Sequence, residues 1–276
     1  SSDLAQPLPE PDFERIDLAA LVKFWLDPAR FFCDRILQVR LLTDRDDAEL
    51  DAEPFEIDAL QRTILSGDAV RARLQMQHDP LETDWARASG RFTPGPLGER
   101  QRSRLALLSD RLAERVRQHG QSTTREVLVR CGRYEVQGTL DGVTGRALVT
   151  WRPSKCKWRD YVATWIRHLV LQLAADADPT LPRQSIHVTL ASTLTFAGLE
   201  NAEEHLLAWI EGYRRGHTEA LPVFEHASWK YAAALRSGEQ DDPDDEAATE
   251  GMGREENARE QAATGYWGSE SSKHGF

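Results

Sequence analysis

Apolar residues near the start of the chain recur with the spacing of an amphipathic helix. They fall at positions i, i+3, i+4 and i+7, namely Leu18, Leu21, Val22 and Trp25. This spacing predicts a helix that the side chain of Asp17 caps. A second helix is expected to begin at Asp27-Pro28, because proline suits a first turn whose N–H groups have no helical partner. Its buried side is expected to consist of Phe32, Ile36 and Val39.

The next part of the chain mixes helical patterns with turn-forming residues. Two short helices are predicted over 58–65 and 68–77, with a break at Ser66-Gly67. Residues 78–98 contain three prolines and three glycines and predict a long loop. Long ordered loops in compact domains are often functional, so this loop is a candidate functional segment.

A long helix and a set of strands follow. The helix is predicted over 99–119, ends at Gly120, and has a core stripe of Leu105, Leu108, Leu112 and Val116. The apolar period then changes from 3.6 to 2, which indicates strands. Three strands are predicted to form an antiparallel meander: 126–131, 134–140 and 147–151.

The pattern then returns to helix. A helix over 157–174 precedes a strand over 186–190 and a last helix over 201–215, which Gly216 ends. The central order, α-β-β-β-α-β, is that of the restriction-endonuclease-like nucleases. The predicted fold class is therefore α/β (α+β) with a PD-(D/E)XK core and added helices. A fold of this kind does not fix the chemistry.

The same patterns divide the chain into regions. Residues 1–14 are rich in proline and read as a linker, and 15–236 form the predicted domain. That domain has a helical first part over 15–78 and its core over 99–216. Residues 237–276 show no apolar period, and we expect an acidic, disordered tail.

Charge is distributed unevenly along the 276 residues. The net charge is −11, while 40% of the residues are hydrophobic and eight are tryptophan, which excludes a fully disordered chain. Residues 239–260 contain 10 acidic and 2 basic side chains, so they carry −8 and the remainder carries −3. The overall acidity therefore does not exclude a nucleic-acid partner.

The cysteines and the first residues of the chain indicate the cellular compartment in which the protein is expected. Cys33, Cys131 and Cys156 are far apart and form no CxxC pair, which argues against a disulfide framework and a zinc ribbon and suits a reducing cytoplasm. The histidines lack metal-ligand spacing, so no metal site is predicted. No apolar run is long enough to span a membrane. The first residue is Ser and no signal peptide follows, which predicts a cytoplasmic fragment of a longer protein.

The predicted strands contain the positions where such nucleases hold Mg²⁺. One acid belongs at the end of the second strand, and Asp141 stands there. The D/E-x-K triplet belongs on the third strand, where this chain has Thr150 and Arg152. Threonine is a weak neutral ligand, and arginine stays protonated and cannot act as a general base. The sequence therefore predicts a degenerate, inactive site, and the simpler interpretation of Asp141 is a turn residue before Gly142.

Two basic clusters are candidates for DNA binding. Four arginines lie within about 60° on the predicted helix and flank its leucine stripe: Arg100, Arg104, Arg111 and Arg115. The second cluster interleaves basic and aromatic side chains, as single-stranded DNA binding does: Trp151, Arg152, Lys155, Lys157 and Arg159. The alternatives are a solvated helix face for the arginines and a core position for the neighbouring Trp158.

Several segments, in order, resemble one family. They are LVKFWLDPARFF over 21–32, EPF over 53–55 with Asp58 and Leu60, LVTWRPS over 148–154 with Trp165 and HLV over 168–170, IEGYRRG over 210–216, and Leu221-Pro222. Over about residues 15–235 the chain is similar to the C-terminal domain of the gamma subunit of exodeoxyribonuclease V, RecC.

The resemblance implies a place in a RecBCD-like machine that processes double-strand breaks. In that family this domain has no motor or nuclease activity. It is expected to help split the incoming duplex, to route the strands and to hold the RecD helicase, with RecB as a further partner. The domain itself would need no cofactor, and ATP and Mg²⁺ would be used by partner subunits. Two other hypotheses stay open: a metal-dependent nuclease that joins Asp141 with Glu126 or Glu135, and a pure protein-interaction module.

Overall fold

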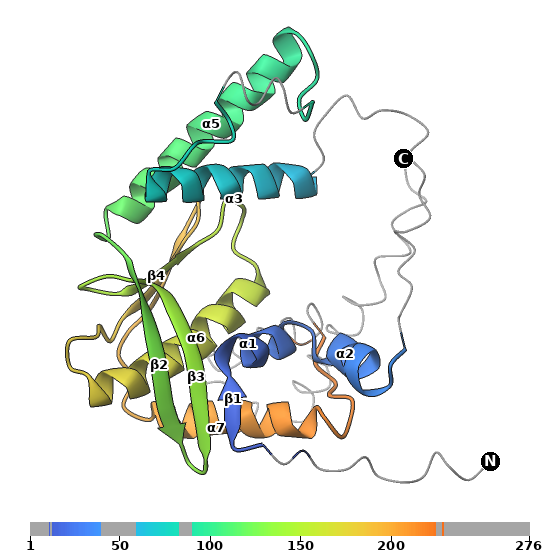
Figure 1. Cartoon of the computed structure of the whole chain (residues 1–276), viewed down its shortest axis with the longest axis vertical. Helices are drawn as coiled ribbons and strands as arrows, with labels where there is room; N and C mark the ends of the chain where they lie inside the picture. Colours follow the sequence, from blue (N-terminus) through green and yellow to red (C-terminus); the bar gives the residue numbers. More distant parts are fainter. Residues whose placement is uncertain (1–10, 12, 40–58, 83–89, 225–227, 229–276) are drawn as a thin grey trace, which may run out of the picture. The chain divides into compact units, whose positions relative to one another are not determined.

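The computed structural model describes residues 11, 13–39, 59–82, 90–224 and 228 (Figure 1). Most of the predicted linker, residues 53–55 of the resemblance and the acidic tail lie outside these residues. In chain order the elements are β1 (Arg15–Asp17), α1 (Leu18–Leu26), α2 (Pro28–Phe31), the π-helix η2 (Phe32–Ile36), α3 (Ala59–Gln75), α5 (Pro96–Arg117), β2 (Thr123–Cys131), β3 (Tyr134–Val143), β4 (Leu148–Trp151), α6 (Trp158–Ala177), β5 (Ser185–Val188), β6 (Thr193–Phe196) and α7 (Ala202–Arg215).

The chain divides into two compact units. One contains residues 12–22 and 42–210, and the other contains 1–11, 23–41 and 211–276. Helices α1 and α7 each contribute residues to both. Among the helices of the described residues, none combines the length and the hydrophobicity that a membrane span requires.

The larger unit is built on a mixed sheet in which β3 is the central strand. The order is β1-β3-β4-β5-β6, and β2 pairs with β3 in antiparallel register from Cys131↔Tyr134 to Thr123↔Val143. Strand β4 joins β3 at Val143↔Leu148 and runs antiparallel to it. The predicted three-strand meander is thus confirmed, with Gly132 in the left-handed conformation (φ 57°) that its turn requires.

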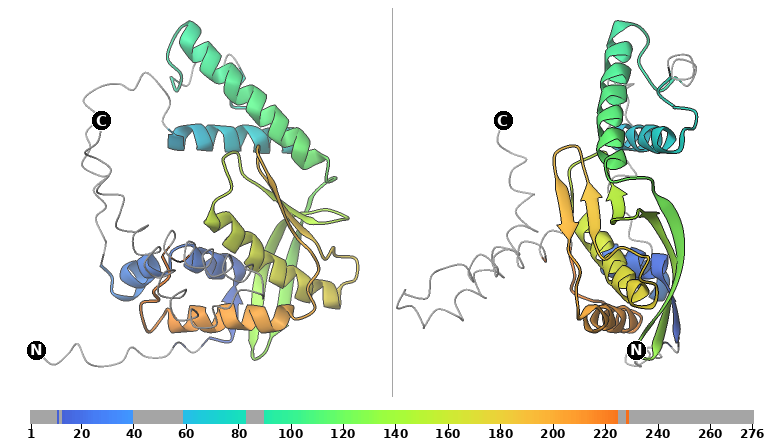
Figure 2. Two further views of the ribbon diagram at one scale, coloured as in Figure 1. Left: turned by 180° about the vertical axis from the view of Figure 1, so that it is seen from behind. Right: turned by 90° about the vertical axis from the view of Figure 1, so that its left-hand side faces the viewer.

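Strands β4 and β5 are parallel, and α6 forms the crossover between them (Figure 2). Alternate residues of β4 and β5 face opposite layers. On one face Val149 and Val188 belong to a core cluster with Val70 of α3 and Leu112 of α5. On the other face lies α6, whose residues from Thr164 to Ala175 are largely buried. The element order α5-β2-β3-β4-α6-β5 therefore agrees with the predicted α-β-β-β-α-β order.

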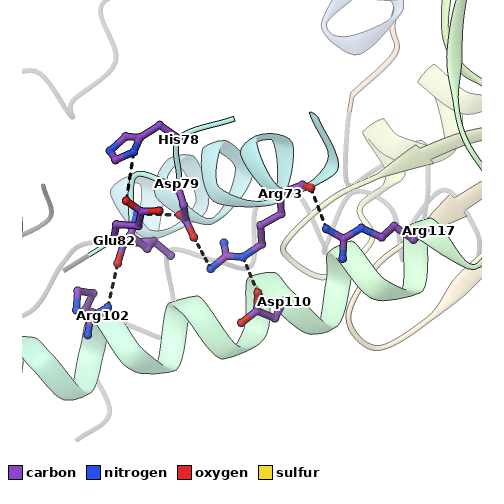
Figure 3. Close-up of polar contacts among 8 residues, drawn as sticks. Arg73, His78, Asp79, Glu82, Arg102, Asp110 and Arg117 are labelled. Carbon is purple, nitrogen blue, oxygen red and sulfur yellow. Dashed lines mark hydrogen bonds and ion pairs between the residues drawn. The ribbon is translucent and has the colours of Figure 1, made fainter. Parts of the chain in front are cut away.

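Helices α3 and α5 form a second layer that charged side chains hold together (Figure 3). The Arg73 guanidinium bridges Asp79 at 2.7 Å and Asp110 of α5 at 2.6 Å, and only 12% of its side chain is exposed. Arg117 of α5 donates to the carbonyl of Arg73 (2.8 Å), and Arg102 donates to the carbonyl of Leu81 (2.9 Å). These bonds tie the end of α3 to α5.

Helix α3 corrects the prediction of two short helices. It continues through Ser66-Gly67 as one element over Ala59–Gln75. Gly67 costs the helix about 1 kcal/mol relative to alanine. Packing outweighs this cost, because residues on both sides of Gly67 are buried: Leu65, Ala69, Val70 and Ala72.

Other differences concern short elements and one side chain. Strands β1 and β6 were not expected, because three or four residues give too little alternation to detect. Strand β3 continues to Val143, so the interpretation of Asp141 as a turn residue is wrong. Val39 is 51% exposed rather than buried, because the helix ends at Ile36.

Aromatic rings gather in the smaller unit. The Phe24 ring makes edge contacts with Trp25, Phe31 and Tyr213, with centroids 5.0–5.2 Å apart. The backbone at Gly212 and Gly216, about one helical turn apart, lies close to these rings because glycine has no side chain. An added Cβ at Gly212 would fall 2.5 Å from the Trp25 ring, and one at Gly216 would overlap the Phe24 ring. Two segments of the family resemblance, LVKFWLDPARFF and IEGYRRG, thus meet in this cluster.

We predict that Gly212→Ala lowers the free energy of unfolding, although alanine normally favours a helix. The methyl group would displace the Trp25 ring from its packed position, at a cost of about 1–3 kcal/mol. Gly67→Ala is the matched control, because an added Cβ there meets nothing within 4 Å and should stabilise α3 by up to about 1 kcal/mol. Urea unfolding followed by tryptophan fluorescence measures both. Equal stabilisation by the two substitutions would contradict the packing role.

Candidate functional site

The segment that follows β4 is held by a network around Arg152. The guanidinium donates to Ser154 Oγ at 2.6 Å and to Asp160 Oδ1 of α6 at 3.0 Å. The other carboxylate oxygen of Asp160 accepts from the backbone N–H of Lys157 (2.8 Å) and so caps α6. Arg152 and Asp160 are both mostly buried, with 26% and 13% of their side chains exposed. The WRPS residues therefore fix the exit of β4 to the start of α6.

Thr150 also faces α6, two residues before Arg152 on β4. Its hydroxyl lies 2.9 Å from Nδ1 of His187 on β5, the strand that pairs with β4. His187 is buried, and desolvation lowers its pKa from the usual value, an effect that Asp160 opposes and that Arg152 and Arg167 reinforce. Thr150, which the sequence pattern assigns to the acid position of a nuclease, is thus a neutral hydroxyl bound to a buried imidazole ring of lowered pKa.

Asp141 is exposed on β3. Its Oδ1 accepts a hydrogen bond from Thr124 Oγ1 at 2.7 Å, across the β2–β3 pair. The next residue, Gly142, has φ 90°, and the β2–β3 register shifts between Thr123 and Thr124. The Arg167 guanidinium of α6 interacts electrostatically with Asp141, and burial lowers the pKa of Arg167. A half-buried arginine, absent from the sequence-based site, therefore accompanies Asp141.

The structure separates one pair of acids that the nuclease hypothesis would join. Glu135 pairs with Arg15 at 3.0 Å at the start of β3. It lies six residues from Asp141, which corresponds to about 20 Å along a strand. Glu126 sits opposite Thr139, as Asp141 sits opposite Thr124, so Glu126 and Asp141 are diagonal neighbours on one face of the β2–β3 pair. Glu135 cannot share a metal ion with Asp141.

Helix α5 carries the first basic cluster on the side opposite its buried residues. Arg100, Arg104 and Arg111 are exposed, and Leu107 on the same side is 51% exposed. The buried side of α5 is formed by Leu105, Ser109, Leu112 and Val116. Arg115 differs, because it donates to the Leu190 carbonyl (2.7 Å) and to Thr193 Oγ1 (2.9 Å). Arg115 thus anchors α5 to the β5–β6 connection, while the other three arginines project into solvent.

The second basic cluster is split between layers. Trp151 packs against the core cluster beneath α5, whereas Thr150 and Arg152 face α6. Lys155 and Lys157 are exposed, and Arg159 is half-buried. Trp158 is half-buried with its Nε1 inside the protein, so the alternative of a core position suits this ring. Trp151 and Lys157 therefore do not form one open stacking platform.

A groove lies between α3, α5 and the segment after β4. It encloses about 230 Å³ and is lined by Arg62 and Ser66 of α3, Leu105 and Ser109 of α5, and Pro153 and Ser154. The hydroxyl of Ser109 is buried and lacks a hydrogen-bond partner in the described structure. The groove brings the WRPS segment next to the helix that carries the exposed arginines.

Sequence reasoning missed two residues of this region, Arg167 and His187. Both occupy positions where the helical or strand pattern alone predicts packing. Their roles arise from the crossover that lays α6 across β4 and β5, which brings residues far apart in sequence together. Local spacing carries no signal for such contacts.

The comparisons with known proteins agree with the resemblance. The model of the RecC C-terminal domain family matches residues 13–236. The RecBCD enzyme subunit RecC of Escherichia coli (strain K12) is 28% identical over 244 residues, which cover 87% of this chain and 21% of that protein. RecC of Buchnera aphidicola subsp. Schizaphis graminum (strain Sg) is 21% identical over 218 residues, 78% of this chain and 20% of that protein. The chain spans about one fifth of the length of these relatives.

We predict that Arg152→Ala lowers the free energy of unfolding by about 1–3 kcal/mol, because the mostly buried Asp160 would lose its charged partner. Arg152→Lys should recover only part of this loss, since an ammonium cannot reproduce the two directed bonds to Ser154 and Asp160. Lys155→Ala, at an exposed neighbour, is the control and should change stability by less than about 0.5 kcal/mol. Urea unfolding measures all three, and an Arg152→Ala protein as stable as the control would refute the network.

Proposed function

This chain belongs to the RecC C-terminal domain family, and from that premise we propose that it is a non-catalytic, DNA-contacting domain of a RecBCD-type helicase–nuclease. Its biological role would be double-strand break repair by homologous recombination. The partners would be RecB- and RecD-type subunits and the DNA that they process. Splitting the duplex, routing its strands and docking the RecD helicase are the specific tasks that we assign to it.

The lack of catalysis is supported by the residues that replace the nuclease ligands. The observed order of helices and strands supports a nuclease-like core. In such a core, Thr150 and Arg152 would stand where an active nuclease has an acid and a lysine. Arg152 pairs with Asp160, and Thr150 pairs with His187. Mg²⁺ binds through oxygen ligands, usually carboxylates, and gives up its hydration shell reluctantly. A guanidinium supplies no oxygen ligand and a threonine hydroxyl supplies only a weak, neutral one, so ATP and Mg²⁺ would be used by partner subunits.

DNA contact is supported by the exposed arginines of α5, which is the observation that carries the proposal. Arg100, Arg104 and Arg111 repeat along one side of the helix, on the side away from the α3–α5 ion pairs. Like charges at such spacing destabilise a helix unless an anionic partner compensates them. Arginine forms bidentate bonds with phosphate, and Leu107 among the arginines offers an apolar contact to a base or a sugar.

A protein-interaction module is the second candidate, and the exposed side of α5 also favours it. Arginine with exposed leucine is a composition that protein interfaces use, and Leu97 at the start of α5 is 47% exposed. Binding to DNA separates the two candidates, because only phosphate contact releases counterions and gives a steep salt dependence.

We predict that the chain binds DNA at low salt and that affinity falls steeply as salt rises. In the triple variant R100A/R104A/R111A, the slope of log affinity against log salt should decrease by about 2–3, since each lost phosphate contact removes about 0.7–0.9. Fluorescence anisotropy with labelled single- and double-stranded DNA measures both slopes.

The control for this experiment removes the same charge elsewhere. Arg71, Arg183 and Arg215 each pair with an acid of the protein, namely Asp68, Asp176 and Glu219. R71A/R183A/R215A should therefore change the slope much less than the α5 variant. Equal slopes in the two variants would refute a specific role of α5, and absence of binding at low salt with retained binding to a RecD-type helicase would favour the interaction module.

A further inference from the structure

Three potential metal ligands from separate elements converge next to the Arg152 network. Cys156 lies in the segment after β4, Asp160 in the first turn of α6, and His187 in β5. One ligand atom of each lies within 4.8 Å of the other two. His187 is 4% exposed, and the other two are half-buried. Cys156 and Asp160 are four residues apart, and His187 lies 27 residues after Asp160 on β5.

The histidine supplies an independent indication of a ligand. Its Nε2 atom is buried and has no hydrogen-bond partner among the described residues. Its Nδ1 atom lies 2.9 Å from Thr150 Oγ1, and that hydroxyl lies 3.4 Å from the Ile186 carbonyl, to which it can donate. If the hydroxyl donates to that carbonyl, Nδ1 carries the proton and Nε2 presents its lone pair. Metal-binding histidines are oriented in this way by a hydrogen bond at the other ring nitrogen.

Asp160 can bind a metal and keep its existing bonds, whereas Cys156 would exchange weak contacts with the Lys157 carbonyl and the Tyr161 side chain for the metal. The carboxylate of Asp160 accepts one bond from Arg152 and one from the Lys157 N–H, and its two oxygens offer about four acceptor positions in total. The Cys156 sulfur is 3.9 Å from the Lys157 carbonyl, a weak contact that a metal would replace. In a tetrahedral zinc site the ligand atoms lie about 3.3–3.7 Å apart. The ligand atoms lie up to 4.8 Å apart, so Cys156 and the mostly buried Asp160 would need to move by about 1 Å to reach that spacing.

We propose that Cys156, Asp160 and His187 bind one Zn²⁺ ion, with a water molecule as the fourth ligand. Sulfur and imidazole donors select zinc over magnesium. On binding, the Cys156 thiol loses its proton to solvent, so thiolate and carboxylate balance the two charges of the ion. Arg152 and Arg167 lie near His187 and repel any cation. Zn²⁺ can offset this repulsion through its bonds to sulfur and nitrogen, whereas Mg²⁺ cannot. The ion would tie the exit of β4, the start of α6 and β5 together.

This proposal does not depend on DNA contact, because its ligands lie outside the exposed side of α5. Co²⁺ is the probe, since it takes zinc sites and shows absorption bands that report tetrahedral coordination and a thiolate ligand. Titration of the full chain with Co²⁺ should give one equivalent of binding, a thiolate-to-cobalt band in the near ultraviolet and d–d bands in the visible. Zn²⁺ should abolish these bands, and a large excess of Mg²⁺ should leave them unchanged.

Variants identify the ligands. Cys156→Ser should remove the thiolate band and weaken Co²⁺ binding at least about 10-fold, and His187→Gln should weaken it similarly. Cys33→Ser is the matched control, because Cys33 is also a free, half-buried cysteine, and it should leave the spectrum unchanged. Circular dichroism will show whether His187→Gln folds. If it does not, Cys156→Ser and Cys156→Ala alone test the assignment, because the Cys156 side chain is partly exposed and is not part of the core.

Two results would overturn the proposal. One is failure of the folded chain to bind Co²⁺ or Zn²⁺ at sub-millimolar concentration. The other is a cobalt spectrum that Cys156→Ser leaves intact, which would assign the ion to another group. The chain has three cysteines, so loss of the band in Cys33→Ser instead would likewise refute the assignment.

Discussion

The ion pair between Arg152 and Asp160 is the constraint on which the interpretation of this domain depends. It closes the end of β4 against the start of α6, and both partners are mostly withdrawn from water. A charge pair of this kind must be complete, because a lone buried carboxylate or guanidinium would cost several kcal/mol. Ser154 and the Lys157 N–H satisfy the remaining bonds of the two groups.

The two sides of helix α5 differ in how their charges are paired. On the side of α5 that faces α3, acidic and basic groups neutralise one another, as Arg73 does with Asp79 and Asp110. The opposite side keeps three arginines in solvent. The chain as a whole is acidic, so a binding surface for an anion must be local, and this side of α5 is the surface that we propose. Arg115 belongs to the same predicted stripe but bonds to the β5–β6 connection, which shows that spacing alone does not separate binding residues from structural ones.

The sequence predicted most of the long elements and few of the contacts between them. Helix α5 and the β2–β3–β4 meander followed from periodicity, because their apolar positions repeat over many residues. The break at Gly67 was predicted wrongly, since packing against α5 outweighs the local preference of glycine. The place of Thr150 on the third predicted strand, with Arg152 directly after that strand, was also readable from the pattern. Their contacts with His187 and Asp160, the half-buried Arg167 and the proximity of His187 to Cys156 depend on the β4–α6–β5 crossover, which no local pattern encodes.

The central claim, that this domain guides DNA and does not cut it, is tested most directly by a cleavage assay. The full chain would be incubated with linear duplex and single-stranded DNA in Mg²⁺ and in Mn²⁺, next to an Asp141→Ala variant purified in the same way. Equal and background levels of product in the two proteins are expected, because Asp141 has no second carboxylate ligand on β4. Products that form with the unmodified chain and disappear with Asp141→Ala would contradict the account.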